Sequence, residues 1–205
     1  MNQHVWWYTA RAGGITAWAV ATASVLWGLA LSTRALGSKP RAPWLLDLHR
    51  FLGGLAIVFT GVHIAGLVAD SYSHFGPSEI LVPLASSWKP WPVALGVVAF
   101  YLLVAIELTS LLKRWLPNRL WHGVHLGSFG LYALSTAHVL LAGTDRTNRG
   151  LLAATWGSVL LVTFFTAYRF LVPKGARVAA ARARGQAARS TGGARVPAAS
   201  GTPER

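Results

Sequence analysis

The sequence predicts an all-α membrane protein, a polytopic bundle of five transmembrane helices followed by a disordered basic tail. Hydrophobic residues make up 53% of the 205 residues and charged residues only 12%, whereas soluble domains carry about 25% charged residues. Five apolar stretches are long enough to span a bilayer. The Lys and Arg residues behind the net charge of +13 gather at the ends of these stretches and in the tail, which indicates the lipid bilayer rather than nucleic acid as the partner.

The five spans are expected at residues 15–33, 44–69, 91–112, 120–142 and 151–172. Each has about the 20 residues that a hydrocarbon core of about 30 Å requires. The first is too long for the apolar region of a signal peptide, and a basic stretch follows it where a cleavage site would be expected, so we predict a retained helix. Residues 70–90 mix aromatic residues, prolines and an apolar patch, which suggests a segment lying along the membrane interface.

The distribution of cations between the loops predicts the orientation. The connections after the first and third spans carry Arg34, Lys39, Arg41, Lys113, Arg114 and Arg119. The positive-inside rule therefore places the N-terminus outside and the C-terminus in the cytoplasm, and we expect the plasma membrane. Only the short loop with Arg146 and Arg149 disagrees, and Asp145 lies beside these cations.

The composition also divides the chain. Residues 1–172 form the predicted membrane domain, and residues 173–205, rich in Ala, Arg, Gly and Ser, cannot bury an apolar face and are predicted to be disordered. The chain has no cysteine, which excludes structural disulfides, thiolate-bound iron–sulfur clusters and covalently attached haem.

Four histidines lie inside the second and fourth spans, where an imidazole is costly unless it is paired or ligated. His49 and His125 each lie five residues into their span, whereas His63 and His138 lie nineteen and eighteen residues in. Since both spans enter from the cytoplasmic side, equal depth pairs His49 with His125 and His63 with His138. The two levels are about 20 Å apart at about 1.5 Å per residue, which leaves room for two planar macrocycles held between the spans.

The helical angle agrees less well with this pairing. At about 100° per residue, His63 returns to within roughly 40° of His49, but His138 is some 140° away from His125. We therefore expect the fourth span to bend, to contain a local bulge, or to present its two histidines to opposite sides.

Other residues of these spans bear on the same site. Small residues permit close approach of a ligand or of another helix, and the second and fourth spans contain Gly53, Gly54, Gly61, Gly66, Gly123, Gly127 and Gly130. Arg50 is predicted to pair with an anionic group at the inner face or to extend to lipid headgroups. His122 competes as a ligand at a shallower depth, and His4 and His74 are expected to be solvated. Glu107 is an ionisable group within the third span, either a proton or quinone contact or a partner for an interfacial cation.

The spacings His-x13-His and His-x12-His, two spans apart, resemble the ferric reductase-like transmembrane domain. NADPH oxidases, metalloreductases and the haem subunit of bacterial methionine sulfoxide reductase systems share that domain, and the similarity covers residues 15–170. The resemblance implies two haem b groups, an inner one ligated by His49 and His125 and an outer one ligated by His63 and His138. It also implies electron flow between the two faces of the membrane.

The chain departs from the family in two ways. Full-length oxidases and ferric reductases have six core helices and continue into FAD- and NAD(P)H-binding domains, whereas this sequence has five spans and no glycine-rich dinucleotide motif. We therefore expect a membrane subunit of an oxidoreductase that exchanges electrons with a separate flavoprotein, a quinol or a redox protein. Two alternatives stay open: a membrane protein that binds or transports a transition metal through the same imidazoles, and a helical scaffold without a cofactor.

Overall fold

The protein is described here from a computed structural model, which describes residues 4–33, 43–71, 75–145 and 147–172, together with 175–176, 179–180, 182–183 and 186 of the tail. All regular secondary structure within these residues is helical, which confirms the predicted all-α class. The α-helices are α1 (Val5–Thr33), α2 (Pro43–Ala69), α3 (Pro77–Leu81), α4 (Pro90–Leu111), α5 (Asn118–Leu126), α6 (Ser128–Ala142) and α7 (Arg149–Leu171), and a short 3₁₀ helix, η1, covers Lys113–Trp115.

Five segments of the described chain are long and apolar enough to cross a membrane: α1, α2, α4, α5 with α6, and α7. These are the five predicted spans, with ends that agree to within two residues except in α1. Helix α1 begins ten residues earlier than predicted, at Val5, and so includes Trp6, Trp7 and Tyr8. Aromatic residues of this kind are enriched at the membrane–water interface, so the helix continues past the apolar stretch into the interfacial layer.

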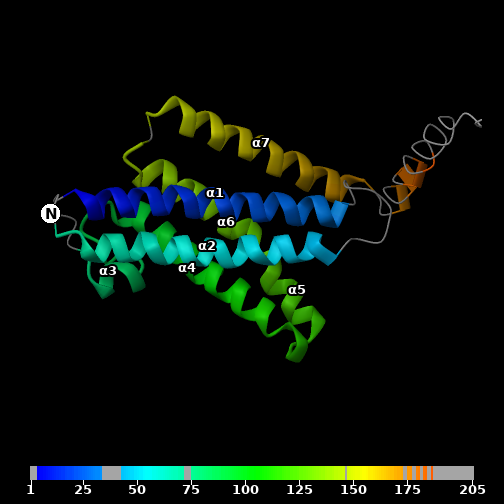
Figure 1. Ribbon diagram of the computed structural model, residues 1–205, viewed down its shortest axis with the longest axis horizontal. Coiled ribbons are helices and arrows are strands. Elements are labelled where there is room, and N and C mark those ends of the chain that lie inside the picture. Colours follow the sequence, from blue (N-terminus) through cyan, green and yellow to red (C-terminus); the bar gives the residue numbers. More distant parts are fainter. Residues whose placement is uncertain are drawn as a thin grey trace, which may run out of the picture.

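Helices α1 and α2 form an antiparallel pair along the long axis of the molecule (Figure 1). Helix α6 packs mainly on α4, and α7 packs on α1. A central apolar cluster joins α1, α2, α4 and α6 through Ala21, Ala56, Ala99, Leu103, Ile106 and Leu131, and a second cluster joins α1, α6 and α7 through Val25, Leu29, Tyr132 and Val162. The bundle therefore has its core where α1 meets the other spanning helices.

Buried hydrogen bonds connect the same helices. The indole of Trp18 in α1 donates to Thr136 Oγ1 in α6 at 3.0 Å, and the hydroxyls of Tyr132 in α6 and Ser158 in α7 are 2.8 Å apart. Because water is absent from the bilayer core, polar groups there have to find partners within the protein. These bonds fix α6 between α1 and α7.

The segment between α2 and α4 contains the short helix α3. Gly76 caps α3 through its backbone N–H, which donates to Glu79 Oε2 at 2.8 Å, and Tyr101 of α4 donates its hydroxyl to the Leu81 carbonyl. The segment exposes the large apolar side chains of Leu81, Val82, Leu84 and Trp88. These contacts attach α3 to the end of α4, and the exposed apolar side chains suit the interfacial position that the sequence suggests.

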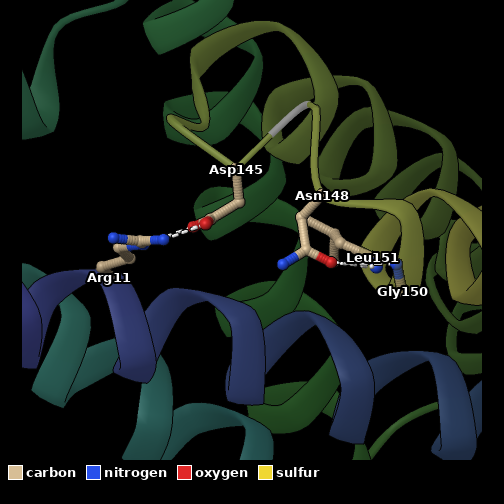
Figure 2. Close-up of polar contacts among 5 residues, drawn as sticks. All are labelled: Arg11, Asp145, Asn148, Gly150 and Leu151. Carbon is tan, nitrogen blue, oxygen red and sulfur yellow. Dashed lines mark hydrogen bonds and ion pairs between the residues drawn. The ribbon is translucent and has the colours of Figure 1, made fainter.

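An ion pair connects the beginning of α1 with the loop between α6 and α7. The guanidinium of Arg11 donates from two nitrogens to the two carboxylate oxygens of Asp145 (Figure 2). In the same loop the Asn148 side chain caps α7 by accepting from the N–H groups of Gly150 and Leu151 at 2.9 and 3.1 Å. Asp145 thus neutralises a cation of α1 at the end of the bundle where the loop charges departed from the positive-inside pattern.

Some residues on which the sequence predictions depend lie outside the described ones. These residues are the loop cations at 34–42, His74, Arg146 and most of the basic tail, including 187–205.

Candidate functional site

His63 of α2 and His138 of α6 lie opposite each other. Their ring centroids are 6.4 Å apart and their planes are inclined by 76°. Both side chains are half-buried, and each projects from a different half of the bundle, since α2 packs on α1 and α6 packs on α4. The two imidazoles meet where these halves face each other.

Each of these two rings is anchored by the backbone of a neighbouring helix. His63 Nδ1 lies 2.6 Å from the carbonyl oxygen of Ala10 in α1, and His138 Nδ1 lies 2.7 Å from the carbonyl oxygen of Pro92 in α4. A carbonyl oxygen only accepts hydrogen bonds, so Nδ1 is the donor in both cases. The neutral ring then has its lone pair on Nε2, so that Nε2 is the nitrogen able to bind a metal ion.

His49 of α2 and His125 of α5 form the second pair. Their ring centroids are 6.0 Å apart and the planes are inclined by 80°. His49 Nδ1 lies 3.3 Å from Ser24 Oγ of α1, whereas the buried His125 Nδ1 has no hydrogen-bond partner within the described chain. Trp121 stacks on the His125 ring at 4.9 Å with an interplanar angle of 19°. The two pairs therefore share their geometry but differ in their surroundings.

Glycines of neighbouring helices make room for three of the four rings. A Cβ atom added to Gly14 of α1 would lie 2.8 Å from His63 Nδ1, one added to Gly28 of α1 would lie 3.1 Å from His49 Cε1, and one added to Gly96 of α4 would lie 2.7 Å from His138 Nδ1. Such approaches are shorter than normal van der Waals contact. A residue larger than glycine at any of these three positions would therefore collide with the histidine ring.

Our sequence reasoning did not single out these three glycines, although a signal for two of them is present. Gly14 and Gly28 are fourteen residues apart in α1, as are His49 and His63 in the antiparallel α2. Equal spacing on two antiparallel helices brings both glycine–histidine contacts into register at once. Other glycines that we did single out differ in their surroundings. A Cβ atom added to Gly54, Gly61 or Gly123 would meet nothing within 4 Å. One added to Gly53 would meet the Glu107 carboxylate, and one added to Gly66 would meet the Ala10 backbone.

The break between α5 and α6 provides the bend that the fourth span was expected to need. Gly127 separates the two helices, and its N–H donates to the carbonyl of Val124 at 2.9 Å, which is a tighter turn than an α-helix makes. A Cβ atom at Gly127 would lie 2.8 Å from the same carbonyl oxygen. Glycine thus permits a local turn between His125 and His138, and both rings reach α2 despite the unfavourable spacing.

The remaining predicted site residues belong to neither of the two ring pairs. The Arg50 side chain is 69% exposed and pairs with Asp47 at 3.4 Å. His122 is exposed and contacts Trp121 edge-on, and His4 is exposed. Glu107 is half-buried against Gly53, one helical turn beyond His49.

An apolar layer separates the two ring pairs. Ala56 lies seven residues from both His49 and His63, and Leu131 lies between His125 and His138; both belong to the central cluster. Within the described chain no group of three or more His, Cys, Asp or Glu side chains converges, so each level offers two imidazoles.

Comparisons with protein-family models, with curated proteins and with solved structures found no match to this chain.

Proposed function

We propose that this protein is a dihaem b-type cytochrome that passes electrons between the two faces of the membrane as a subunit of a reductase system. The observation that carries the proposal is the pairing of four intramembrane imidazoles at two depths, with ring centroids 6.0 and 6.4 Å apart. The family resemblance of the histidine spacings supports the same function.

The separation of the rings fits a metal ion bound between them. A metal–imidazole bond is about 2.0 Å long and the ring centre lies about 1.1 Å beyond the nitrogen, so two rings on opposite sides of one metal have centroids about 6.2 Å apart. Both pairs agree with this value within 0.2 Å.

The hydrogen bonds of the rings fit the same role. The carbonyls of Ala10 and Pro92 hold the Nδ1 protons of His63 and His138 and so leave Nε2 free to ligate. Outer partners of this kind orient ligating histidines and raise their basicity.

His49 with His125, and His63 with His138, would each hold one haem, which would supply one-electron transfer. The two levels lie about 20 Å apart along α2. Ala56, Leu131 and the rest of the central cluster exclude water between the levels. In the orientation that the positive-inside rule predicts, in the plasma membrane, His49 and His125 lie towards the cytoplasm and a separate flavoprotein, quinol or redox protein exchanges electrons there.

Transition-metal binding without a porphyrin is the alternative function. A structural or catalytic zinc site uses at least three protein ligands, and each level here provides two imidazoles. A porphyrin supplies the four equatorial nitrogens itself, so two imidazoles complete its coordination. The number of ligands therefore favours haem.

The optical spectrum of the protein purified after expression with added haem precursor tests the proposal. We expect a Soret band, reduced α-bands of bis-imidazole haem, and two haems per chain. His63→Ala should remove roughly half of the haem and stop electron transfer from external dithionite to ferricyanide trapped in proteoliposomes. His4→Ala, which removes an exposed histidine outside both pairs, is the matched control and should change neither. Absence of the Soret band, two haems retained by His63→Ala, or stoichiometric zinc or copper without porphyrin would refute the proposal.

A further inference from the structure

A stack of three side chains leads from the surface to the His49–His125 pair. The ammonium of Lys113 lies 3.8 Å from the centroid of the Trp121 ring, and the same indole stacks on the His125 ring with the centroids 4.9 Å apart. Lys113 belongs to η1, which is exposed, whereas Trp121 is half-buried on α5. We refer to Lys113, Trp121 and His125 as the inner stack.

The inner stack contains two polar atoms without a partner. Trp121 Nε1 and His125 Nδ1 are both buried, and neither has a hydrogen-bond partner within the described residues. The indole N–H is a donor only, so it requires an acceptor. Lys113 forms no ion pair in the described chain, and its positive charge stands over the same indole. A buried donor next to a cation fits an anionic oxygen.

Arg50 was predicted either to pair with an anionic group at this level or to extend to lipid headgroups. Its side chain is 69% exposed and engages Asp47. The pairing with Asp47 already balances its charge, so the inner stack is the better placed source of positive charge beside the His49–His125 pair.

We propose that Trp121 Nε1 and Lys113 bind a carboxylate on the edge of the porphyrin held between His49 and His125. This inference rests on the function proposed above. An anionic lipid phosphate has the same acceptor chemistry, but the indole nitrogen is buried and its ring stacks on His125, which favours a carboxylate that arrives with the macrocycle. The inner stack then holds the porphyrin by its edge while the imidazoles hold its iron.

The test measures haem release from the full-length protein in nanodiscs to apomyoglobin. A charge-assisted hydrogen bond contributes enough that its loss speeds release about tenfold. We expect about this increase for Trp121→Phe, which keeps the aromatic stack and removes the N–H, and for Lys113→Met, whereas Lys113→Arg keeps the slow rate. Measurement in the His63→Ala background confines the signal to the haem between His49 and His125.

A second cation–aromatic pair at the same end of the bundle supplies the matched controls. Arg114 lies 3.8 Å from the centroid of the Trp115 ring, but Trp115 is 63% exposed and has no ring contact with a histidine among the described residues. Arg114→Met and Trp115→Phe should leave haem release unchanged. If Trp121→Phe does not fold, the exposed Lys113 still carries the test through Lys113→Met.

Haem b dimethyl ester distinguishes the sources of the anion. The ester has no free carboxylate, so we expect ester-loaded wild type and ester-loaded Trp121→Phe to release the porphyrin at the same rate. The proposal is overturned if both variants release haem at the wild-type rate, if their effect persists with the ester, or if it occurs only in nanodiscs containing phosphatidylglycerol, which would assign the site to lipid. A wild-type protein that binds no haem at all is a different result and refutes the proposed function instead.

Discussion

Replacing Gly96 with alanine should displace the His138 ring while leaving the fold intact. The added Cβ would lie 2.7 Å from His138 Cε1 and Nδ1, and ordinary van der Waals contact begins at 3.4 Å, so the ring has to retreat by about 0.7 Å. Its hydrogen bond to the Pro92 carbonyl, worth about 1 kcal/mol, is strained or lost. Alanine in a helix recovers up to about 1 kcal/mol relative to glycine, so the free energy of unfolding should stay within about 1 kcal/mol of wild type.

The affinity for haem should fall far more than the stability. Loss of the group that orients a metal-bound histidine weakens binding about 10- to 100-fold, so Gly96→Ala should lose the haem at the His63–His138 level and keep the other. Haem content per chain and thermal unfolding, measured on the same preparation, report the two effects separately. Gly54→Ala is the matched control because a Cβ at Gly54 meets nothing within 4 Å. Two tightly bound haems in Gly96→Ala would refute the positioning of His138 by α4.

Three further substitutions test the fold around the site. Asp145→Asn removes the ion pair with Arg11 and should lower the free energy of unfolding by about 1 kcal/mol or less, because the Arg11 side chain is 36% exposed. Thermal melts in detergent at low and high salt measure this effect. An unchanged melting temperature at low salt would contradict the prediction. Ser158→Ala leaves the buried Tyr132 hydroxyl without its partner and should cost about 1–2 kcal/mol in the same melts, whereas an effect below experimental error would show that the hydroxyl finds another partner. Hydrogen bonds from the backbone and from Ser78 lower the pKa of the exposed Glu79 carboxyl. The cap that Glu79 forms on α3 is therefore present above the ordinary carboxyl pKa and is lost as the pH falls through the lowered value. Amide exchange at Ile80, corrected for intrinsic rates, should rise in acid, and Glu79→Gln should abolish that pH dependence.

Sequence reasoning predicted the depth of each group much better than its direction. Hydropathy located all five spans, since about 20 apolar residues have few other uses in a protein of this composition. Counting residues from the span ends also paired His49 with His125, and the structure brings these rings together. Depth depends only on position along one helix, which sequence records directly.

Contacts between helices were harder to predict because they depend on the rotation and tilt of two helices at once. The roles of Gly14, Gly28 and Gly96 come from the rings that lie against them, and nothing in their local sequence distinguishes them from Gly54 or Gly61. The turn at Gly127 was anticipated only as one of three ways to reconcile His125 with His138. For Arg50, the sequence left open a partner at the site or an extension to headgroups, and in the structure its exposed side chain pairs with Asp47.

The matched fourteen-residue intervals in α1 and α2 have a consequence for how this molecule can evolve. Sliding one helix along the other by a single residue, about 1.5 Å, would move Gly14 away from His63 and Gly28 away from His49 at the same time. An insertion or deletion between Gly14 and Gly28, or between His49 and His63, would make the two intervals unequal, so that both glycine–histidine contacts could not form together. Such a change in one helix is therefore expected to persist only with a matching change in the other.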